Sequence, residues 1–187
     1  MDWLKAAYDA GFTAAGWLDV SKLDFSDAET LRGYCKDNVC GSYGVDWTCP
    51  PAVGEPEQCV ARVRRYMRAI IVQYEEPLKD YSDKAEIARI RSHFKELMRG
   101  FLPIVRSSYP SVLPLGAGGC GLCEECTYPD SPCRHPDKMI QSLSGFCVNA
   151  QRACDIAGMT CWKQGFLAFT GLFLIDKRRV QKIADYV

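Results

Sequence analysis

Residues 69–74, AIIVQY, form one of the two longest apolar runs in the chain. Branched side chains without alternation are typical of a β-strand that is buried on both faces. The other long run, LAFTGLFLID at residues 167–176, predicts a second strand. Together the two runs indicate a sheet on which other elements pack.

Helices are predicted before and after the first of these runs. A helix over residues 56–68 is expected because Pro56 suits a first turn and apolar residues recur at helical spacing. Beyond Pro77, which closes the strand, apolar residues step by three or four along residues 83–101 and predict a long helix. Pro103 is expected to bend or end that helix.

Four further segments complete the predicted order of elements. Residues 3–10 are expected to form a short helix and residues 12–20 a strand. Residues 111–118 predict a weaker strand, at a sheet edge or irregular, because Pro114 cannot donate to a ladder. Apolar residues step by three and four along residues 138–157, which predicts a last long helix.

This order of elements predicts an α+β (or α/β) fold. We expect a single sheet of about four strands, with helices packed on it and two cysteine-rich metal-binding loops. A chain of 187 residues with 48% hydrophobic residues can bury a substantial core. We therefore expect a single metal-binding domain over residues 1–187.

Charge and terminal sequence argue against several classes of function. Lys plus Arg equal Asp plus Glu at 23 each, so no net field attracts nucleic acid or an anionic membrane. The amino-terminal MDWLKAAYDAGF lacks the basic start and apolar segment of an export signal. No apolar run approaches the roughly 20 residues that span a bilayer. We expect a cytoplasmic protein that binds neither nucleic acid nor membranes.

The chain contains eleven cysteines, which is unusual for a protein of the reducing cytoplasm. The odd number leaves one thiol unpaired in any complete set of disulfides. Metal binding explains such a content better than a disulfide framework does.

The densest cysteine group lies at residues 120–133, CGLCEECTYPDSPC. The Cys-x2-Cys-x2-Cys spacing of Cys120, Cys123 and Cys126 matches the run that binds a [4Fe–4S] cluster in bacterial ferredoxins. Cys133 can supply the fourth thiolate, since seven extended residues span up to roughly 25 Å. The segment therefore favours an iron–sulfur cluster.

Zinc is the main alternative at these four cysteines. A tetrahedral zinc site usually takes its thiolates as two close pairs, and the pairs Cys120/Cys123 and Cys126/Cys133 fit that pattern loosely. A redox-active thiol or a disulfide is the third alternative.

An earlier group, Cys35-x4-Cys40-x8-Cys49 followed by two prolines, predicts a second metal site. A Cys-Pro pair closes the ferredoxin run, where that cysteine serves the partner cluster. The alternative is that these are buried structural thiols. Cys59 lies in the predicted helix that follows, and packing in the core is a sufficient role for it.

Cys147, Cys154 and Cys161 follow one another at intervals of seven residues. The first two lie on one face of the predicted last helix, so we interpret them as small apolar core residues. His135 directly follows Arg134 and is expected to be a hydrogen-bonding neighbour of a ligand, with ligation as the alternative.

With both cysteine groups in view, the chain resembles an uncharacterised prokaryotic family of predicted metal-binding proteins, a cysteine-rich domain of unknown function. The resemblance rests on CKDNVCGSYGVDWTCPP (35–51) with the Glu-containing helix start that follows it, and on CGLCEECTYPDSPCRHP (120–136). The second motif is followed by an expected helix that contains Ser142 and Ser144 and by a closing apolar strand. It covers most of the chain, and Cys59, Cys147, Cys154 and Cys161 fall outside it. It implies that the metal ligands are Cys35, Cys40, Cys49, Cys120, Cys123, Cys126 and Cys133.

Three functions follow from these patterns. The first is an iron–sulfur protein with one or two clusters that transfers electrons to a redox protein partner. If the earlier group supplies only the three thiolates of Cys35, Cys40 and Cys49, one iron atom of its cluster would keep an open position for catalysis. The second is a zinc-stabilised structural or interaction module. The third is a metal chaperone or redox sensor with labile thiolates.

Overall fold

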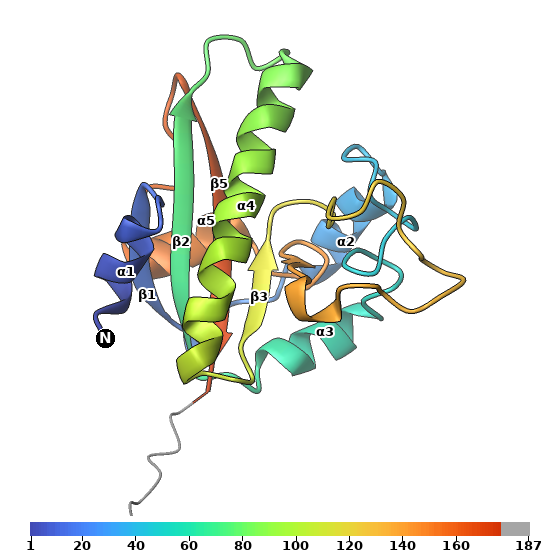
Figure 1. The fold of residues 1–187 in the computed structure, drawn as a ribbon, viewed down its shortest axis with the longest axis horizontal. Coiled ribbons are helices and arrows are strands. Elements are labelled where there is room, and N and C mark those ends of the chain that lie inside the picture. Colours follow the sequence, from blue (N-terminus) through green and yellow to red (C-terminus); the bar gives the residue numbers. More distant parts are fainter. Residues whose placement is uncertain (177–187) are drawn as a thin grey trace, which may run out of the picture.

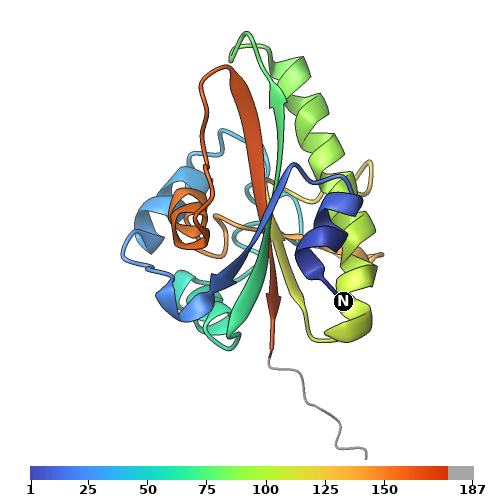
Figure 2. The same cartoon turned by 90° about the vertical axis from the view of Figure 1, so that its left-hand side faces the viewer.

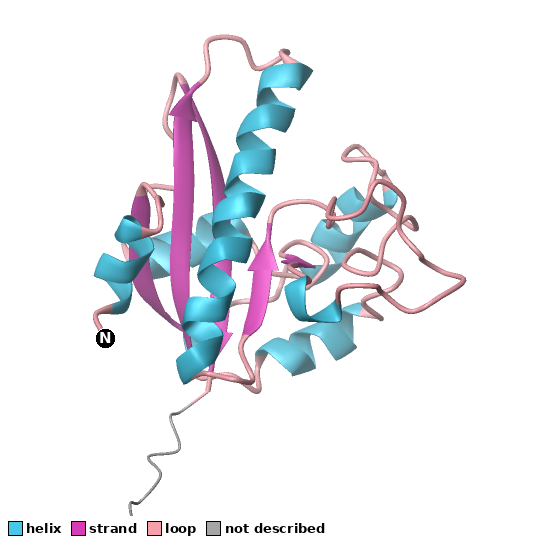
Figure 3. Ribbon diagram, in the orientation of Figure 1, coloured by secondary structure: helices cyan, strands magenta, loops and turns pink. Residues whose placement is uncertain are grey.

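The structure is a computed structural model that describes residues 1–176 (Figures 1 and 3). Short 3-10 helices cover Val20–Lys22 and Pro136–Lys138. The helices of this part are α1 (Trp3–Asp9), α2 (Ala28–Lys36), α3 (Pro56–Val63), α4 (Lys84–Ser108) and α5 (Ala150–Ala157). Its strands are β1 (Ala14–Asp19), β2 (Arg68–Pro77), β3 (Leu113–Gly116), β4 (Gln141–Ser142) and β5 (Phe166–Ile175).

The strands of residues 1–176 form one five-stranded sheet in the order β1-β2-β5-β3-β4. The first three neighbouring pairs are antiparallel, whereas β3 and β4 are parallel. The sheet is therefore mixed and the fold is α+β, as the order of elements predicted. The expected number of about four strands is too low by one, because the two-residue strand β4 lies where a helix was predicted.

Helices cover both faces of the sheet, which explains the continuous apolar runs in β2 and β5. In β2, Ile70 and Val72 pack with α1 and α4, whereas Ala69 and Ile71 pack with α3 and α5. Figure 2 shows α1 and α4 on one side of the sheet and the remaining helices on the other. Because neighbouring residues of a strand point to opposite faces, the central residues of a doubly covered strand are mostly apolar.

The helix predicted over residues 138–157 is wrong in its first half. A 3-10 turn and β4 occupy that part, and α5 begins only at Ala150. The apolar residues at helical spacing serve different cores, since Ile140 packs with α4 and Leu143 packs on the opposite face. Cys147 has a φ of 59°, which a right-handed helix excludes. The spacing of three residues between Ile140 and Leu143 thus does not indicate a helix, because the two side chains lie in different cores on either side of a turn.

The prolines and helix ends differ from the predictions in smaller ways. α4 continues through Pro103, because Leu102 and Val105 on either side of the proline are buried in the core. α3 ends at Val63 rather than near residue 68, where β2 begins. β3 lies inside the sheet and not at its edge. On the side of β3 that faces β4, only Leu115 and Gly116 are paired, so Pro114 needs no backbone donor there.

The patterns in the sequence do not indicate α2. Its only buried side chain is Arg32, so no apolar stripe marks it as a helix. The guanidinium of Arg32 donates to the carbonyl of Gly145 at 2.7 Å and to that of Gly54. These hydrogen bonds fix α2 against two segments that are distant in the sequence.

None of the helices within residues 1–176 is both long enough and apolar enough to cross a membrane.

Replacing Gly171 with Ala is expected to lower the free energy of unfolding by about 1–3 kcal/mol, the usual effect of overpacking a core. A Cβ at this position of β5 would lie 2.6 Å from Met98 Sδ and 3.1 Å from the carbonyl oxygen of Leu115. Gly33→Ala is the control, because a Cβ there meets nothing within 4 Å. Urea unfolding of both variants checks the prediction, and equal stability of Gly171→Ala and wild type would contradict it.

Candidate metal centre

Two cysteine-rich loops, the first loop (residues 37–55) and the second loop (residues 117–135), pack against each other. The indole N–H of Trp47 in the first loop donates to the carbonyl of Ser131 in the second at 3.1 Å. The rings of Trp47 and Tyr128 meet edge to face with their centroids 4.9 Å apart. Both loops lie beside the sheet on the right of Figure 1. Their mutual contacts bring Cys40 of the first group beside Cys123 and Cys126 of the second.

The buried carboxylate of Asp46 joins the two loops. Its Oδ1 accepts hydrogen bonds from the amide of Thr48 at 2.8 Å and from the hydroxyl of Thr48 at 2.7 Å. Its Oδ2 accepts from the amide of Cys120 in the second loop at 3.2 Å. A Cβ on Gly119 would lie 2.3 Å from Oδ2, so only glycine permits this approach. The carboxylate thereby fixes the backbone at the first predicted ligand.

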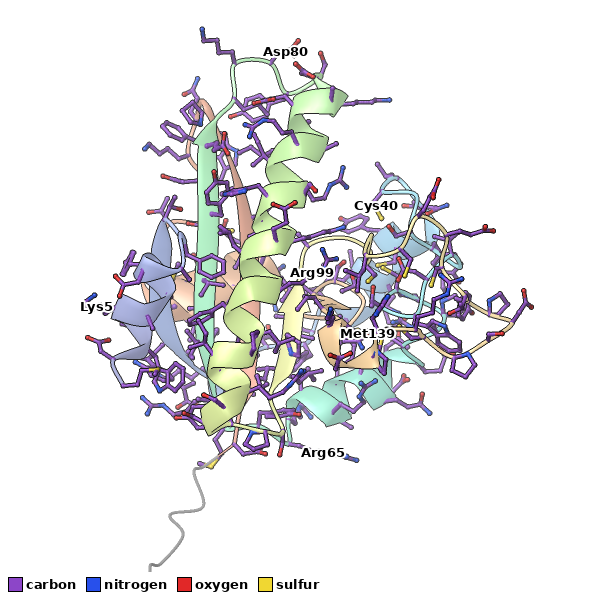
Figure 4. All side chains as sticks on the ribbon, in the orientation of Figure 1. Lys5, Cys40, Arg65, Asp80, Arg99 and Met139 are labelled. Atoms are coloured by element: carbon purple, nitrogen blue, oxygen red, sulfur yellow. The ribbon has the colours of Figure 1, made fainter. Side chains whose placement is uncertain are left out.

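The four cysteines predicted to bind a cluster line one cavity of about 30 Å³. Asp46, Trp47 and Met139 complete part of its wall. Figure 4 shows sulfur atoms gathered among these loops, between the labels of Cys40 and Met139. The fold thus brings together, over one cavity, the cysteines Cys120, Cys123, Cys126 and Cys133.

The sulfur atoms around this cavity are separate thiols. All eleven cysteines are free, so the structure holds no disulfide among residues 1–176. Within the same part of the chain, no three His, Cys, Asp or Glu side chains form a group arranged to hold a metal ion. The four cysteines therefore share a cavity without forming a closed coordination sphere.

Cations of α4 lie next to this cavity. Arg99 donates to the carbonyl of Cys120, and its buried Nε has no hydrogen-bond partner within residues 1–176. Arg91 and Lys95 precede Arg99 on the same helical face, at intervals of four residues. Burial, followed by the charges of Arg91 and Arg99, lowers the pKa of Lys95. The pKa of the Cys120 thiol is raised, mainly by burial. The Leu122 amide and the charge of Arg99 offset part of this effect.

This environment fits a negatively charged metal–thiolate group. Soft sulfur donors are the ligands that iron–sulfur clusters and zinc prefer. A buried guanidinium N–H without a partner leaves room for a further hydrogen bond beside these donors. The residues at the cavity therefore fit such a group: it has thiol ligands, a glycine before the first of them, and cations nearby.

The first cysteine group is divided between two places. Cys35 Sγ lies 3.7 Å from the hydroxyl of Ser144, and Ser144 lies 3.3 Å from the hydroxyl of Ser142. Burial raises the pKa of Cys49 to about 12, and a hydrogen bond with Ser142 acts in the opposite direction. Cys40 instead lines an open groove of about 620 Å³, together with Cys123 and Cys126. Cys35 and Cys49 thus adjoin one pair of serines, while Cys40 faces the second loop.

The other cysteines are mostly in the core, as expected from their sequence context. Cys59, Cys147 and Cys154 are fully buried, and Cys161 packs against the same core. Cys147 lies in a turn, so the prediction that it shares a helical face with Cys154 is wrong. The backbone amide of His135 donates to Cys133 Sγ at 3.4 Å.

Three residues of the site were not predicted from the sequence, and each leaves a recognisable signal. Asp46 and Thr48 are two residues apart in a loop, a spacing typical of an aspartate that accepts a hydrogen bond from the following backbone. Arg99 belongs to the cationic face of α4, whose spacing of four residues is visible in the sequence. The sequence alone does not show that these signals converge on the cysteines.

Cys161 is expected to be alkylated with a midpoint near pH 7. A hydrogen bond with the Cys154 thiol lowers the pKa of Cys161 to about 7 from its ordinary value of 9.0. The thiolate is the nucleophile, so the rate should be low below this pH and should rise above it. By contrast, burial raises the pKa of Cys147 to about 11, so it should react slowly.

Peptide mapping after brief iodoacetamide treatment between pH 5 and 10 measures this midpoint. Cys154→Ala is the matched control, because it removes the hydrogen bond and should move the midpoint toward 9.0. A wild-type midpoint already near that ordinary value would contradict the prediction.

Comparison with known proteins identifies a protein family. A family model described as "Predicted metal-binding protein (DUF2284)" matches residues 16–175. No curated protein and no solved structure matched the chain. The matched range contains both cysteine groups, the sheet and α4. The chain therefore belongs to this family of predicted metal-binding proteins, whose function is unknown.

Proposed function

We propose that the second loop binds an iron–sulfur cluster, most simply [4Fe–4S], and that the protein transfers electrons. The observation that supports this most strongly is the cavity shared by Cys120, Cys123, Cys126 and Cys133. Their spacing allows three thiolates two residues apart to reach three different iron atoms, and the fourth comes from farther along the loop. A bound cluster would accept and release single electrons.

The surrounding residues have defined roles in this proposal. Arg99 and Lys95 would offset the negative charge of four thiolates and a cluster, which favours the reduced form. Asp46 would hold the Cys120 amide in place through its hydrogen bond. Trp47 and Met139, which line the cavity, would exclude water from the sulfur atoms. Local polarity and solvent exclusion are general determinants of cluster potential.

Zinc is the second candidate, and the small volume of the cavity, about 30 Å³, favours it. A single zinc ion held by four thiolates would fasten two loops that have little regular secondary structure. In that case the protein would be a structural or interaction module. A redox sensor is the third candidate, and the hydrogen bond with Cys154 that lowers the pKa of Cys161 favours it.

The setting of this function is also part of the proposal. Eleven free thiols are compatible with the reducing cytoplasm, where disulfides are rare. We expect the electron partner to be a redox protein that approaches the exposed side of the two loops. Cys40 and Val45 are exposed there, so a partner could come close to the cavity.

Anaerobic purification followed by elemental analysis tests the proposal. Iron, acid-labile sulfide and zinc are assayed on one sample whose visible spectrum is also recorded. Equal iron and sulfide with a broad band near roughly 400 nm would support the cluster. A colourless protein with about one zinc per chain would overturn it in favour of the structural module.

A further inference from the structure

An open groove lies between α4 and the two cysteine-rich loops. Its volume is about 620 Å³, within the roughly 300–1,000 Å³ that is typical of binding sites for small molecules. Arg91 and Lys95 of α4 form part of its wall, and Cys40 and Cys123 of the two loops form another part. In Figure 4, Cys40 is labelled among the loops, to the right of α4. The groove thus has the size of a ligand site and adjoins the candidate metal centre.

The two cations of α4 in this groove have no counter-ion of their own. Arg89 on the same helix forms ion pairs with Glu76 and Glu86. By contrast, the side chains of Arg91 and Lys95 form no hydrogen bond or ion pair within residues 1–176. They are four residues apart and therefore lie on one face of the helix. Two neighbouring cations of this kind can share one anionic group.

Two glycines of the second loop leave space in front of these cations. Gly118 and Gly121 have φ values of 69° and 60°, in the left-handed region that favours glycine. A Cβ on Gly118 would lie 3.6 Å from Arg91 Cδ, and a Cβ on Gly121 would lie 3.6 Å from Lys95 Nζ. The backbone of the loop therefore passes close to both cations, and the absence of side chains keeps them accessible.

The acidic residues of the groove restrict what it can bind. Both carboxylate oxygens of Asp46 already accept hydrogen bonds from the protein. Glu124 and Glu125 are exposed and also line the groove. Because like charges repel, these glutamates disfavour a polyanion that extends along the groove. A ligand with a single anionic group can contact Arg91 and Lys95 without approaching the glutamates.

We propose that this groove binds a small organic anion, whose one carboxylate or phosphate group is held by Arg91 and Lys95. The planar guanidinium of Arg91 suits both groups, since each accepts two parallel N–H bonds. Val45 and Tyr128 in the wall provide apolar surface for the rest of the ligand. Cys123 lines both the groove and the shared cavity, so the ligand would lie beside the proposed cluster. That adjacency rests on the proposed function, whereas binding of the anion does not.

Isothermal titration calorimetry of anaerobically purified protein tests this proposal. Benzoate and phenyl phosphate are the probes, because each joins one anionic group to an apolar ring, and benzamide is the neutral counterpart of benzoate. In Tris–chloride buffer of low ionic strength, at least one of the two anions should bind at millimolar concentrations, and benzamide should not bind. Tighter binding of benzoate would identify a carboxylate ligand, and tighter binding of phenyl phosphate would identify a phosphate ester.

Variants of the groove locate the binding site. Arg91→Gln and Lys95→Gln should each weaken binding by about tenfold or more, because each removes a hydrogen bond to a charged group. Lys84→Gln is the matched control, since it removes the same charge from an exposed position at the start of α4, outside the groove. It should bind like wild type. Glu124→Gln removes a repulsive charge and should bind the anion more tightly, a gain that misfolding does not produce.

Four results would overturn the proposal. They are the absence of binding by either anion, equal binding of benzamide, wild-type affinity in both Arg91→Gln and Lys95→Gln, and an equal loss of affinity in Lys84→Gln. The metal content of the same samples separates these results from a failure of the proposed function. Anion binding by a protein without metal would support the groove and refute the metal centre. Metal without anion binding would refute the groove alone.

Discussion

Cys123→Ser is expected to lose the entire metal complement of the second loop. Cys123 lies in the middle of the cysteine run and lines the shared cavity with Cys120 and Cys126. A serine hydroxyl is a far weaker ligand for iron or zinc than a thiolate, so the affinity should fall by orders of magnitude. Metal content per chain, measured after anaerobic purification, is the direct readout.

Cys154→Ser is the matched control for this prediction. It makes the same chemical change at a buried cysteine of α5, whose thiol contacts Thr170. The metal content of this variant should equal that of wild type. Loss of metal from both variants would show that unfolding, and not ligation, determines the metal content; retention by Cys123→Ser would remove that residue from the ligands.

Asp46→Ala is expected to lower the free energy of unfolding by about 3 kcal/mol, since buried donors without acceptors cost about 1–3 kcal/mol each. The carboxylate accepts hydrogen bonds from the amide and hydroxyl of Thr48 and from the amide of Cys120. Lys95 would also lose a favourable charge interaction with this carboxylate. Urea denaturation of the purified proteins measures the change.

Asp37→Ala provides the control for Asp46→Ala, because Asp37 is an exposed carboxylate just after α2. Its replacement should alter the free energy of unfolding by less than about 0.5 kcal/mol. Equal stability of the two variants would mean that Asp46 does not join the loops. Metal content of Asp46→Ala should also fall, because the Cys120 backbone is no longer fixed.

The sheet could be predicted from the sequence because its signals are local. Buried strands such as residues 69–74 need apolar residues on both faces, and that requirement is visible without knowing the partners. The start of α4 is likewise local, because Asp83 accepts a hydrogen bond from the Glu86 amide at 2.9 Å. β4 and α2 could not be predicted, because each depends on contacts with distant segments.

The cysteine spacing singled out four residues that line one cavity, whereas the surroundings of these residues depend on the tertiary fold. Arg99 approaches Cys120 from α4, and Asp46 approaches it from the other loop. The turn at Cys147 shows the limit of periodicity, since its apolar residues match helical spacing although Cys147 has a left-handed φ of 59°. The spacing of cysteines identifies candidate ligands, but the residues that position those cysteines are visible only in the tertiary structure.

X-ray anomalous scattering from crystals of anaerobically prepared protein tests the central claim most directly. Data recorded at the iron and zinc absorption edges should show an iron peak within bonding distance, about 2.3 Å, of the sulfur atoms of residues 120, 123, 126 and 133. A zinc peak at that position would retain the metal site and refute the cluster. Ordered loops with no anomalous peak between those four sulfur atoms would contradict metal binding there altogether.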